Sequence, residues 1–359
     1  MSKIAVFNLG STSFKYKIFD AGNRVYACGM VENISGIDGH FEAFKKANVD
    51  FTDVSAVGYK AVHGGNLSGA RLVDDSVIAV MEQFSKFAPA HNPIYISFIR
   101  SMQKEYPQLP QIAYFETSFH AAIPEYRRAY GVPAAWRKDL GIRRYGFHGS
   151  SHEYISLKMK EYEPDRKRVI SIHLGGSSSV CAISDGKSVA CSMGATPQSG
   201  LFQNNRVGDF DVFCLPALME RFGQDQVFNI LSRESGLLGL SGVSGDMRQI
   251  LKAAKDGNER AAFALDAYID NIIGYIGMFG AYLGGVDAIA LTGGIGFNSK
   301  EIQSRICRRL NIDPAESIED GDARISEEDA IPVYKMKTDE EYIVAKHVKE
   351  FLETGYETA

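Results

Sequence analysis

The sequence predicts an α/β protein built from two duplicated domains. Its 359 residues exceed what a single hydrophobic core usually supports, and 45% hydrophobic with 23% charged residues are typical of a globular chain. Segments with strand and helix patterns alternate along the chain, and one strand-and-turn pattern occurs twice. The corresponding leucines of the two copies, Leu9 and Leu174, are 165 positions apart, which favours two homologous domains over an array of short repeats.

The repeated unit is an apolar strand that runs into a turn rich in glycine and serine. Residues 3–15 read KIAVFNLGSTSFK, and residues 168–180 read RVISIHLGGSSSV. In both copies Leu-Gly follows the strand, small hydroxyl residues come next, and another glycine-containing turn follows about ten residues later, as in a β-hairpin. We therefore expect each domain to begin with a hairpin.

Between the two copies the pattern predicts strands at 56–62 and 112–115, with a helix at 76–87 between them. Pro89 and Pro93 then stop the helix and redirect the chain. The apolar positions on one face of this helix are Val77, Val80, Met81, Phe84 and Phe87.

In the second half, residues 261–283 predict a long helix that ends at Gly284. Asp266 and Asp270 within it indicate a core helix rather than a membrane span. Its buried stripe consists of Leu265, Ile269, Ile272, Ile276, Phe279 and Leu283. The remaining predicted elements are a strand at 288–291, a glycine turn at 292–296, a strand at 332–336 and a helix at 339–351.

Composition argues against several classes of protein. The net charge is −5 and no basic stripe is present, so we expect no nucleic-acid partner. The five cysteines are dispersed and form no CxxC pair, which fits a reducing cytoplasm better than a disulfide framework or a zinc ribbon. A strand that begins at residue 4 leaves no room for a signal peptide, so we expect a cytoplasmic protein without a membrane segment.

The turn after the first strand has the chemistry of an anion-binding loop. Ser11 and Ser13 offer hydroxyl groups, and Gly10, which has no Cβ, lets an anion approach the backbone closely. A single turn of this kind is more often an ordinary hairpin turn, but the second copy and the glycine turn at 293–296 favour phosphate binding. No segment matches the pattern GxxxxGK[ST], so a Walker-type fold is not indicated.

Phosphoryl transfer also needs cations around the charge of the transferring oxygens. Arg206 stands in a polar segment without apolar periodicity, which is typical of a side chain presented to a ligand. Lys60 lies in an apolar strand, where a buried lysine needs a partner. The candidate cations are Lys15, Lys60, Arg143, Arg144, Arg206 and Arg248.

The segment 143–152 contains two histidines, His148 and His152, at a spacing that could bind zinc on a helix. Gly146 and Gly149 argue against a helix at this point, and the glutamate of a HExxH motif is missing. We therefore interpret His148 as a hydrogen-bond donor to an oxyanion.

Eight short segments stand out along the chain: NLGSTSFK (8–15), VHGG (62–65), APAHNP (88–93), RYGFHG (144–149), HLG (173–175), GD (208–209), SGLLGLSGVS (235–244) and GIG (294–296). These motifs resemble those of acetate kinases and the related propionate kinases, in the same order from end to end. The resemblance implies the fold shared with sugar kinases, Hsp70 and actin, which consists of two duplicated ribonuclease H-like domains (the ASKHA superfamily) with an interdomain nucleotide cleft. The first domain would be 1–150, completed by a C-terminal helix at about 338–359, and the second would be 151–337. The resemblance also implies a homodimer.

By the same resemblance, the protein transfers phosphate from ATP to a short-chain carboxylate by direct in-line attack, with Mg²⁺ or Mn²⁺, and its partners are ATP, ADP, the acid and its acyl phosphate. Catalytic roles fall on Lys60, Glu116, His148 and Arg206, and the metal would be held by Asn8 and Glu340. The nucleotide and its phosphates would contact Ser11, Ser13, Lys15, His173, Gly175, Gly176, Asp246, Arg248, Gly294 and Gly296. The acid would contact Lys60, Val62, Ala90, Phe147 and Pro197.

The chain departs from the family at several of these positions. Lys60 replaces an arginine and Glu116 replaces an aspartate, and a shorter cation facing a longer anion would keep such a pair within reach. Ala90 replaces a leucine, which enlarges the acid pocket and predicts an acid larger or more polar than acetate. Gly176 replaces an asparagine, as in butyrate kinases, and Phe297 replaces a glutamate.

These departures leave other interpretations open. The Lys60 change could alter substrate choice rather than compensate for Glu116. The chain could also be a nucleotide-binding regulatory homologue without catalysis, a butyrate-kinase-like enzyme, or a kinase that uses pyrophosphate. Asp246 and Arg248 favour an adenosine-containing donor.

Overall fold

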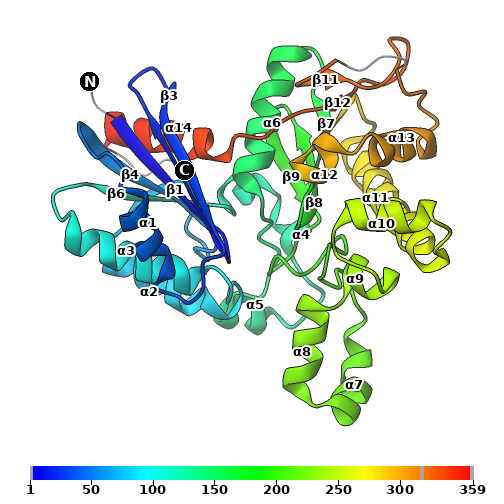
Figure 1. The fold of residues 1–359 in the computed structure, drawn as a ribbon, viewed down its shortest axis with the longest axis horizontal. Coiled ribbons are helices and arrows are strands. Elements are labelled where there is room, and N and C mark those ends of the chain that lie inside the picture. The colour runs from blue at the N-terminus through cyan, green and yellow to red at the C-terminus, as the bar shows by residue number, and fades with distance from the viewer. Residues whose placement is uncertain (1–2, 316–318, 356–359) are drawn as a thin grey trace. The chain divides into compact units, whose positions relative to one another are not determined.

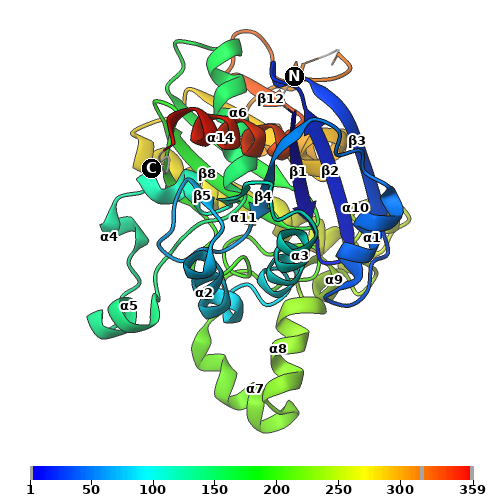
Figure 2. The same ribbon diagram turned by 90° about the vertical axis from the view of Figure 1, so that its left-hand side faces the viewer.

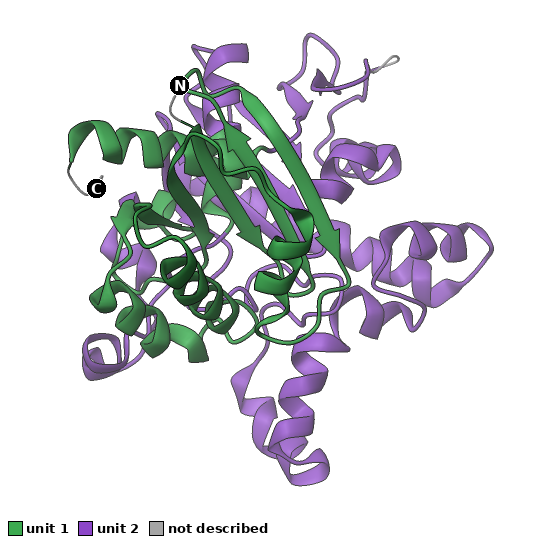
Figure 3. Ribbon diagram, turned by 60° about the vertical axis from the view of Figure 1, so that its left-hand side comes forward, with its two compact units in different colours: residues 1–121, 148–154, 339–359 green, residues 122–147, 155–338 purple. Residues whose placement is uncertain are grey.

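The computed structural model describes residues 3–315 and 319–355. The chain forms two compact units, shown in different colours in Figure 3. Unit 1 consists of Met1–Ala121, His148–Tyr154 and Asp339–Ala359, and unit 2 consists of Ala122–Phe147 and Ile155–Thr338. The expected first domain, 1–150 with the C-terminal helix, thus differs from unit 1 mainly in residues 122–147. This segment packs in unit 2, where the N–H of Tyr145 donates to the carbonyl of Gly194 at 2.9 Å.

Unit 1 is built on a mixed β-sheet in the order β3-β2-β1-β4-β6-β5. Strand β1 is antiparallel to β2 and parallel to β4, and β4 is parallel to β6. The strands are β1 (Lys3–Leu9), β2 (Ser13–Phe19), β3 (Val25–Glu32), β4 (Val54–Ala61), β5 (Ala70–Leu72) and β6 (Gln111–Phe115). The helices are α1 (Gly39–Ala47), α2 (Asp75–Gln83), η1 (Phe84–Lys86), α3 (Asn92–Glu105), η2 (Ser118–Ala122) and α14 (Glu340–Thr354).

Both faces of this sheet are covered, which explains why β1 is apolar from Ile4 to Phe7. On one face Phe7 and Tyr59 pack against Phe98 of α3, with ring centroids 5.3 and 6.2 Å away. On the other face α14 packs against β1 and β4 (Figure 2). The approach is close, because a Cβ added at Gly58 would lie 2.9 Å from a methyl of Val348. The last helix is therefore an integral part of unit 1.

Unit 2 repeats this topology. Its sheet has the order β11-β12-β10-β7-β8-β9, in which β7 is antiparallel to β8 and parallel to β10, and β10 is parallel to β12 (Figure 1). Strands β7, β8, β9, β10, β12 and β11 thus correspond to β1, β2, β3, β4, β6 and β5. The duplication predicted from the sequence is confirmed. The strands are β7 (Arg168–Leu174), β8 (Ser178–Ser184), β9 (Lys187–Cys191), β10 (Ala288–Thr292), β11 (Ala323–Arg324) and β12 (Val333–Lys335).

The core of unit 2 forms around the long helix α11 (Glu259–Leu283), which packs against β7, β8 and the helices α9, α10 and α13. Its predicted stripe is buried from Leu265 to Phe279. The other helices are α4 (Glu125–Arg128), α5 (Ala134–Leu140), η3 (Val212–Cys214), α7 (Leu215–Phe222), α8 (Gln224–Arg233), α9 (Gly236–Ser241), α10 (Met247–Lys255), α12 (Gly293–Asn298) and α13 (Lys300–Arg309). Helix α6 (Gly149–Tyr162) has residues in both units.

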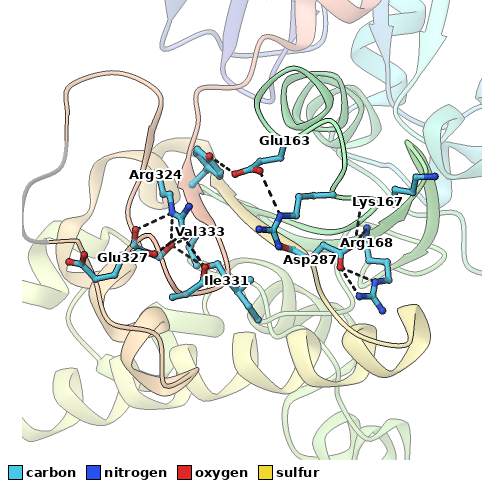
Figure 4. A network of polar contacts seen from close by, with 12 residues as sticks. Glu163, Lys167, Arg168, Asp287, Arg324, Glu327, Ile331 and Val333 are labelled. Atoms are coloured by element: carbon cyan, nitrogen blue, oxygen red, sulfur yellow. Dashed lines mark hydrogen bonds and ion pairs between the residues drawn. The ribbon is translucent and has the colours of Figure 1, made fainter.

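An ion pair fastens the first residues of β7 to the segment before β10. Asp287 accepts hydrogen bonds from the backbone N–H groups of Lys167 (3.1 Å) and Arg168 (2.8 Å), and from the Arg168 guanidinium at 2.6 Å (Figure 4). These bonds fix the register of the two parallel strands. As a result His173 and Thr292, at the carboxyl ends of β7 and β10, are paired.

The structure corrects one predicted element and shortens another. The expected turn at 293–296 is the first part of helix α12, because Gly293, with φ of +77°, allows the chain to turn directly from β10 into a helix. The helix predicted at 76–87 ends at Gln83 and continues as a 3₁₀ turn. None of the described helices is long and apolar enough to cross a membrane.

Candidate active site

The loop after β1 is held by side chains from three other elements of unit 1. The Asn8 amide donates to Glu341 at 2.6 Å, the N–H of Leu9 donates to the hydroxyl of Tyr95 at 2.8 Å, and His40 Nε2 bonds the carbonyl of Gly10 at 2.8 Å. A Cβ at Gly10 would lie 2.5 Å from Ser13 Oγ, so the tight turn requires glycine. The loop is fixed before any ligand arrives.

The predicted phosphate-binding groups gather around this loop. Asn8 and Lys15 are opposite each other in the β1–β2 register, so their side chains lie on the same face of the hairpin. Lys15 and Ser11 are exposed and Ser13 is half-buried. The hairpin thus presents one amide, one ammonium and two hydroxyl groups to an anion.

Beside the loop lies a group of charges, two of them buried and two half-buried, that we call the carboxylate cluster. Glu116 and Glu341 are its buried members, and Lys60 and Glu340 are its half-buried members. Lys60 Nζ donates to Glu340 at 2.6 Å and lies 3.8 Å from Glu116 Oε1. Glu116 is therefore within ion-pair distance of Lys60, as the compensation hypothesis requires. The hydrogen bond, however, goes to Glu340, a partner that the sequence did not indicate.

The pKa of Glu116 is far from its usual value. Burial raises its pKa to about 7; Lys60 opposes this rise and Glu340 adds to it. The Ser150 hydroxyl donates to Oε1, whereas the buried Oε2 has no hydrogen-bond partner among the described residues. Burial alone would lower the pKa of Lys60, but Glu116 and Glu340 outweigh it and raise that pKa, so Lys60 remains a cation.

His148 lies next to this cluster because the backbone of Gly149, at the start of α6, lies against the backbone of Glu116. The N–H of Gly149 donates to the carbonyl of Glu116 at 2.9 Å, and a Cβ at Gly149 would lie 2.2 Å from that oxygen. His148 itself has φ of +57°, an uncommon backbone conformation for a residue other than glycine and one often found at functional sites. The expectation that the glycines exclude a helix was wrong for His152, since α6 begins at Gly149.

In unit 2, Arg206 lies in an irregular segment between β9 and α7. It is half-buried, and burial lowers its pKa. Its Nη1 donates only weakly, to neutral oxygens of Ser177 (3.2 Å), Gln203 (3.2 Å) and Pro197 (3.4 Å). A sheltered guanidinium with neutral neighbours is well suited to bind an anionic group.

A second feature of unit 2 is a pocket of about 890 Å³ at the carboxyl ends of β7 and β10. At Gly176 and Gly294 an added Cβ would meet no atom within 4 Å. Asp246 caps α10 and pairs with the exposed guanidinium of Arg248 at 2.5 Å, and this pair keeps the pKa of Asp246 below its usual value. The lining residues include Gly175, Gly176, Asn204, Asp246, Arg248, Leu251, Gly294, Ile295 and Ser299.

Comparison with known proteins identifies the family. The family model described as "Acetokinase family" matches residues 39–346. The chain is 37% identical to the acetate kinase of Bacillus subtilis (strain 168) over 97% of this chain and 99% of the relative, and 39% identical to that of Clostridium botulinum (strain Okra / Type B1) over 97% and 99%. The chain belongs to the acetokinase family. It is therefore a phosphotransferase of the acetate and propionate kinase type, a kinase that transfers phosphate to a carboxylate.

Solved structures of this family have the same fold. The acetate kinase of Porphyromonas gingivalis matches with a TM-score of 0.86 and 32% identity, covering 98% of this chain and 100% of that one. A propionate kinase from Francisella tularensis matches with a TM-score of 0.88 and 29% identity, covering 97% and 99%. The expected ribonuclease H-like, ASKHA-type architecture is confirmed.

The predicted site residues of this family member are divided between the units. Unit 1 contains Asn8, Ser11, Ser13, Lys15, Lys60, Val62, Ala90, Glu116, His148 and Glu340. Unit 2 contains Phe147, His173, Gly175, Gly176, Pro197, Arg206, Asp246, Arg248, Gly294 and Gly296. Gly296 is buried against Leu291 and does not line the pocket.

Sequence reasoning missed Glu341, Tyr95, His40 and Ser150, which hold the loop and the cluster. Glu341 could have been suspected from the Glu-Glu pair that begins the last predicted helix. Tyr95 and His40 gave no such signal, since a buried aromatic side chain in a helix usually indicates only core packing.

Proposed function

We propose that this family member transfers the γ-phosphoryl group of ATP directly to a short-chain carboxylate that is larger or more polar than acetate. A carboxylate oxygen attacks the γ-phosphorus in line, the bond from that phosphorus to the β–γ bridging oxygen breaks, and ADP and an acyl phosphate leave. The observation that supports this proposal best is the carboxylate cluster, because a largely enclosed Lys60 between Glu116 and Glu340 beside an anion-binding loop is costly unless it serves chemistry.

Oxygen donors beside this cluster are of the kind that a divalent metal ion prefers, although the described residues contain no group of three or more His, Cys, Asp or Glu side chains that could hold an ion by themselves. Glu116 Oε2 is buried without a partner among the described residues, and the nearby Glu340 carboxylate and Asn8 amide supply the oxygen ligands that Mg²⁺ and Mn²⁺ prefer. We assign the metal to Asn8 and Glu340. Bound there, the ion would neutralise charge on the transferring phosphate oxygens.

The other residues have supporting roles in this proposal. Lys15, Ser11 and Ser13 bind phosphate oxygens, because they surround the fixed loop on one face of the hairpin. Arg206 and His148 steady the transferring group. Lys60, which keeps its charge, attracts the carboxylate of the acid.

The choice of acid rests on Ala90, which stands where the family has a leucine, while Val62, Phe147 and Pro197 supply the apolar wall. Ala90 is exposed at the turn before α3, and an alanine leaves space that a leucine would fill. Val62 follows β4 in the same unit, whereas Phe147 and Pro197 belong to unit 2. Propionate, butyrate, lactate and glycolate are the acids that this change favours.

A hydroxamate assay with ATP and Mg²⁺ tests the proposal, because hydroxylamine traps the acyl phosphate. We expect turnover, with kcat/KM higher for at least one larger acid than for acetate. The Ala90→Leu variant should move the preference back toward acetate, while Ala21→Leu, at an exposed turn, should not. Bound ATP without turnover of any acid would contradict the proposal and favour a non-catalytic nucleotide-binding homologue.

The phosphoryl donor is, in this proposal, a nucleotide rather than pyrophosphate. A pocket of about 890 Å³ has room for adenosine, and the Asp246–Arg248 pair offers polar groups at its wall. Replacing ATP by pyrophosphate in the assay should abolish turnover. Equal turnover with pyrophosphate would show that the pocket does not serve the donor.

We also propose a homodimer in the cytoplasm. The described cysteines are free thiols, which fits a reducing compartment. Unit 2 exposes large apolar side chains that a second subunit could cover, among them Phe213, Phe228 and Phe263. Light scattering coupled to size-exclusion chromatography should give twice the chain mass; a monomer at micromolar concentration would contradict this proposal.

A further inference from the structure

Arg206 owes its position to a closed loop, residues 200–209, rather than to a helix or strand. The two ends of the loop meet, since the N–H of Gly200 donates to the Asp209 carboxylate and the N–H of Asp209 donates to the carbonyl of Gly200, both at 2.9 Å. Gly200 and Gly208 both have positive φ, and a Cβ at Gly208 would lie 2.5 Å from the N of Phe202. The carboxylate of Asp209 therefore closes the neck of the loop.

Two polar side chains of α11 hold this loop from outside. Asn271 accepts a hydrogen bond from the N–H of Phe202 at 3.2 Å, and one helical turn later Tyr275 donates its hydroxyl to Asp209 Oδ2 at 2.5 Å. Residues four apart lie on the same face of a helix, so the two bonds reach the two limbs of the loop from one surface. Burial and the Asp209 charge raise the pKa of Tyr275, so its hydroxyl keeps the proton that it donates.

Hydrogen bonds inside the loop connect its closed end, at Gly200 and Asp209, to the Arg206 guanidinium. The N–H of Gln203 donates to the carbonyl of Arg206 at 3.0 Å, and Gln203 Oε1 accepts from both Arg206 and Ser177. Displacement of the neck would therefore move the Gln203–Arg206 turn. The backbone of the turn is also bonded to residues 231–238, since the N–H of Leu237 donates to the carbonyl of Gln203 at 2.8 Å and the N–H of Val207 donates to the carbonyl of Leu231 at 2.9 Å. The guanidinium itself bonds only to neutral oxygens at 3.2–3.4 Å, so its place depends on the position of this turn.

Packing does not replace the Tyr275 bond. A cavity of about 180 Å³ lies beside the Tyr275–Asp209 contact, and its lining also includes Arg144, Cys191 and Met278. Because this side of the loop is not filled by side chains, removal of the hydroxyl leaves the two Gly200–Asp209 hydrogen bonds to close the loop without support from α11 at Asp209. The bond joins a hydroxyl to a carboxylate and belongs to the stronger class of hydrogen bonds.

We infer that Tyr275 and Asn271 are positioning residues, through which α11 sets the place of Arg206 for phosphoryl transfer. The inference rests on the proposed function, in which Arg206 steadies the transferring group. A displacement of about 1 Å in a group that acts on a transition state can cost up to about a hundredfold in rate. Tyr275 thus controls kcat rather than substrate binding.

The test compares Tyr275→Phe with Tyr334→Phe in the full chain. The two tyrosines are almost equally buried in unit 2, and both donate to a carboxylate, Tyr334 to Glu163 at 2.8 Å. We expect Tyr275→Phe to lower kcat about tenfold, with KM for ATP changed less than about twofold, and Tyr334→Phe to leave both unchanged. Unchanged kcat in Tyr275→Phe would overturn the inference, as would an equal loss in both variants.

A double-mutant cycle with Arg206→Ala separates positioning from general destabilisation. If Tyr275 acts through Arg206, Tyr275→Phe should cost less than about twofold in the Arg206→Ala background. A full tenfold cost in that background would overturn the inference.

Hydrogen exchange provides a readout that does not depend on turnover. Tyr275→Phe should speed amide exchange in residues 198–210 and leave the β7–β9 strands unchanged; equal exchange in both proteins would overturn the inference. If the wild-type protein phosphorylates none of acetate, propionate, butyrate, lactate and glycolate, the proposed function fails. The exchange measurement still decides whether α11 holds the loop.

Discussion

Replacing Glu116 by glutamine should stabilise the protein at pH 8 while it removes activity. In the folded chain the pKa of Glu116 is raised from an ordinary 4.5 to about 7, because the carboxyl is buried. A carboxyl whose pKa is higher in the folded state binds its proton more tightly there. It therefore stabilises the fold at low pH, and the fold loses that contribution as pH rises from about 4.5 through about 7.

The expected gain in stability of Glu116→Gln follows from the size of this pKa shift. At 1.36 kcal/mol per pH unit, the difference between 4.5 and about 7 corresponds to about 3 kcal/mol. Glu116→Gln keeps the size of the side chain and its contact with Ser150 but cannot ionise. We expect urea unfolding to show the variant up to about 3 kcal/mol more stable than wild type at pH 8 and nearly equal at pH 5, with kcat lower by at least about a hundredfold.

Glu153→Gln is a matched control, because its expected effect on the free energy of unfolding at pH 8 has the opposite sign. Glu153 is also a largely buried glutamate of unit 1, but although burial would raise its pKa, bonds from His347 (2.6 Å) and Tyr114 (2.5 Å) hold that pKa below its usual value. Its carboxylate stabilises the fold above the ordinary pKa and ceases to do so as pH falls, so Glu153→Gln should destabilise at pH 8. If Glu116→Gln is also less stable than wild type at pH 8, the reasoning is refuted.

Three further substitutions test contacts described above. Gly58→Ala should lower the free energy of unfolding by about 1–3 kcal/mol, because the new methyl meets Val348 at 2.9 Å; thermal denaturation measures this. Gly176→Asn should fold normally and lower KM for ATP, since the added side chain enters open space at the pocket. Tyr95→Phe should raise KM for ATP several-fold, because the N–H of Leu9 loses its acceptor and the loop loosens; initial rates at varied ATP measure it.

Two controls accompany these variants. Gly131→Ala adds a methyl where no atom lies within 4 Å, so it should leave stability unchanged. Tyr59→Phe removes another buried hydroxyl of unit 1, one bonded to Gln111 at 2.6 Å, and should leave KM for ATP unchanged. A Gly58→Ala protein as stable as wild type, or equal KM values for the two tyrosine variants, would contradict the respective prediction.

Patterns local in sequence predicted most of the elements, whereas most contacts between distant residues left no signal in the sequence. The duplicated strand and turn predicted that Asn8 and Lys15 belong to one hairpin, and the register places them opposite each other. By contrast, Lys60 and Glu340 are 280 positions apart, and Asn8 and Glu341 are 333 apart, so no periodicity relates them. The start of α6 was missed for a similar reason, because Gly149 is required by a carbonyl of Glu116 rather than by its own neighbours.

Helix α14 gives this chain an unusual order of assembly. Glu340 and Glu341 belong to unit 1, yet the ribosome makes them only after residues 155–338 of unit 2 have been synthesised. While unit 2 is being synthesised, one face of the unit 1 sheet therefore has no covering helix. During the same time Lys60 lacks its hydrogen-bond partner Glu340. Contacts across such long stretches form slowly. The apolar strands on that face stay accessible to other chains until the last helix has been made, so aggregation at this stage is the hazard that this fold creates.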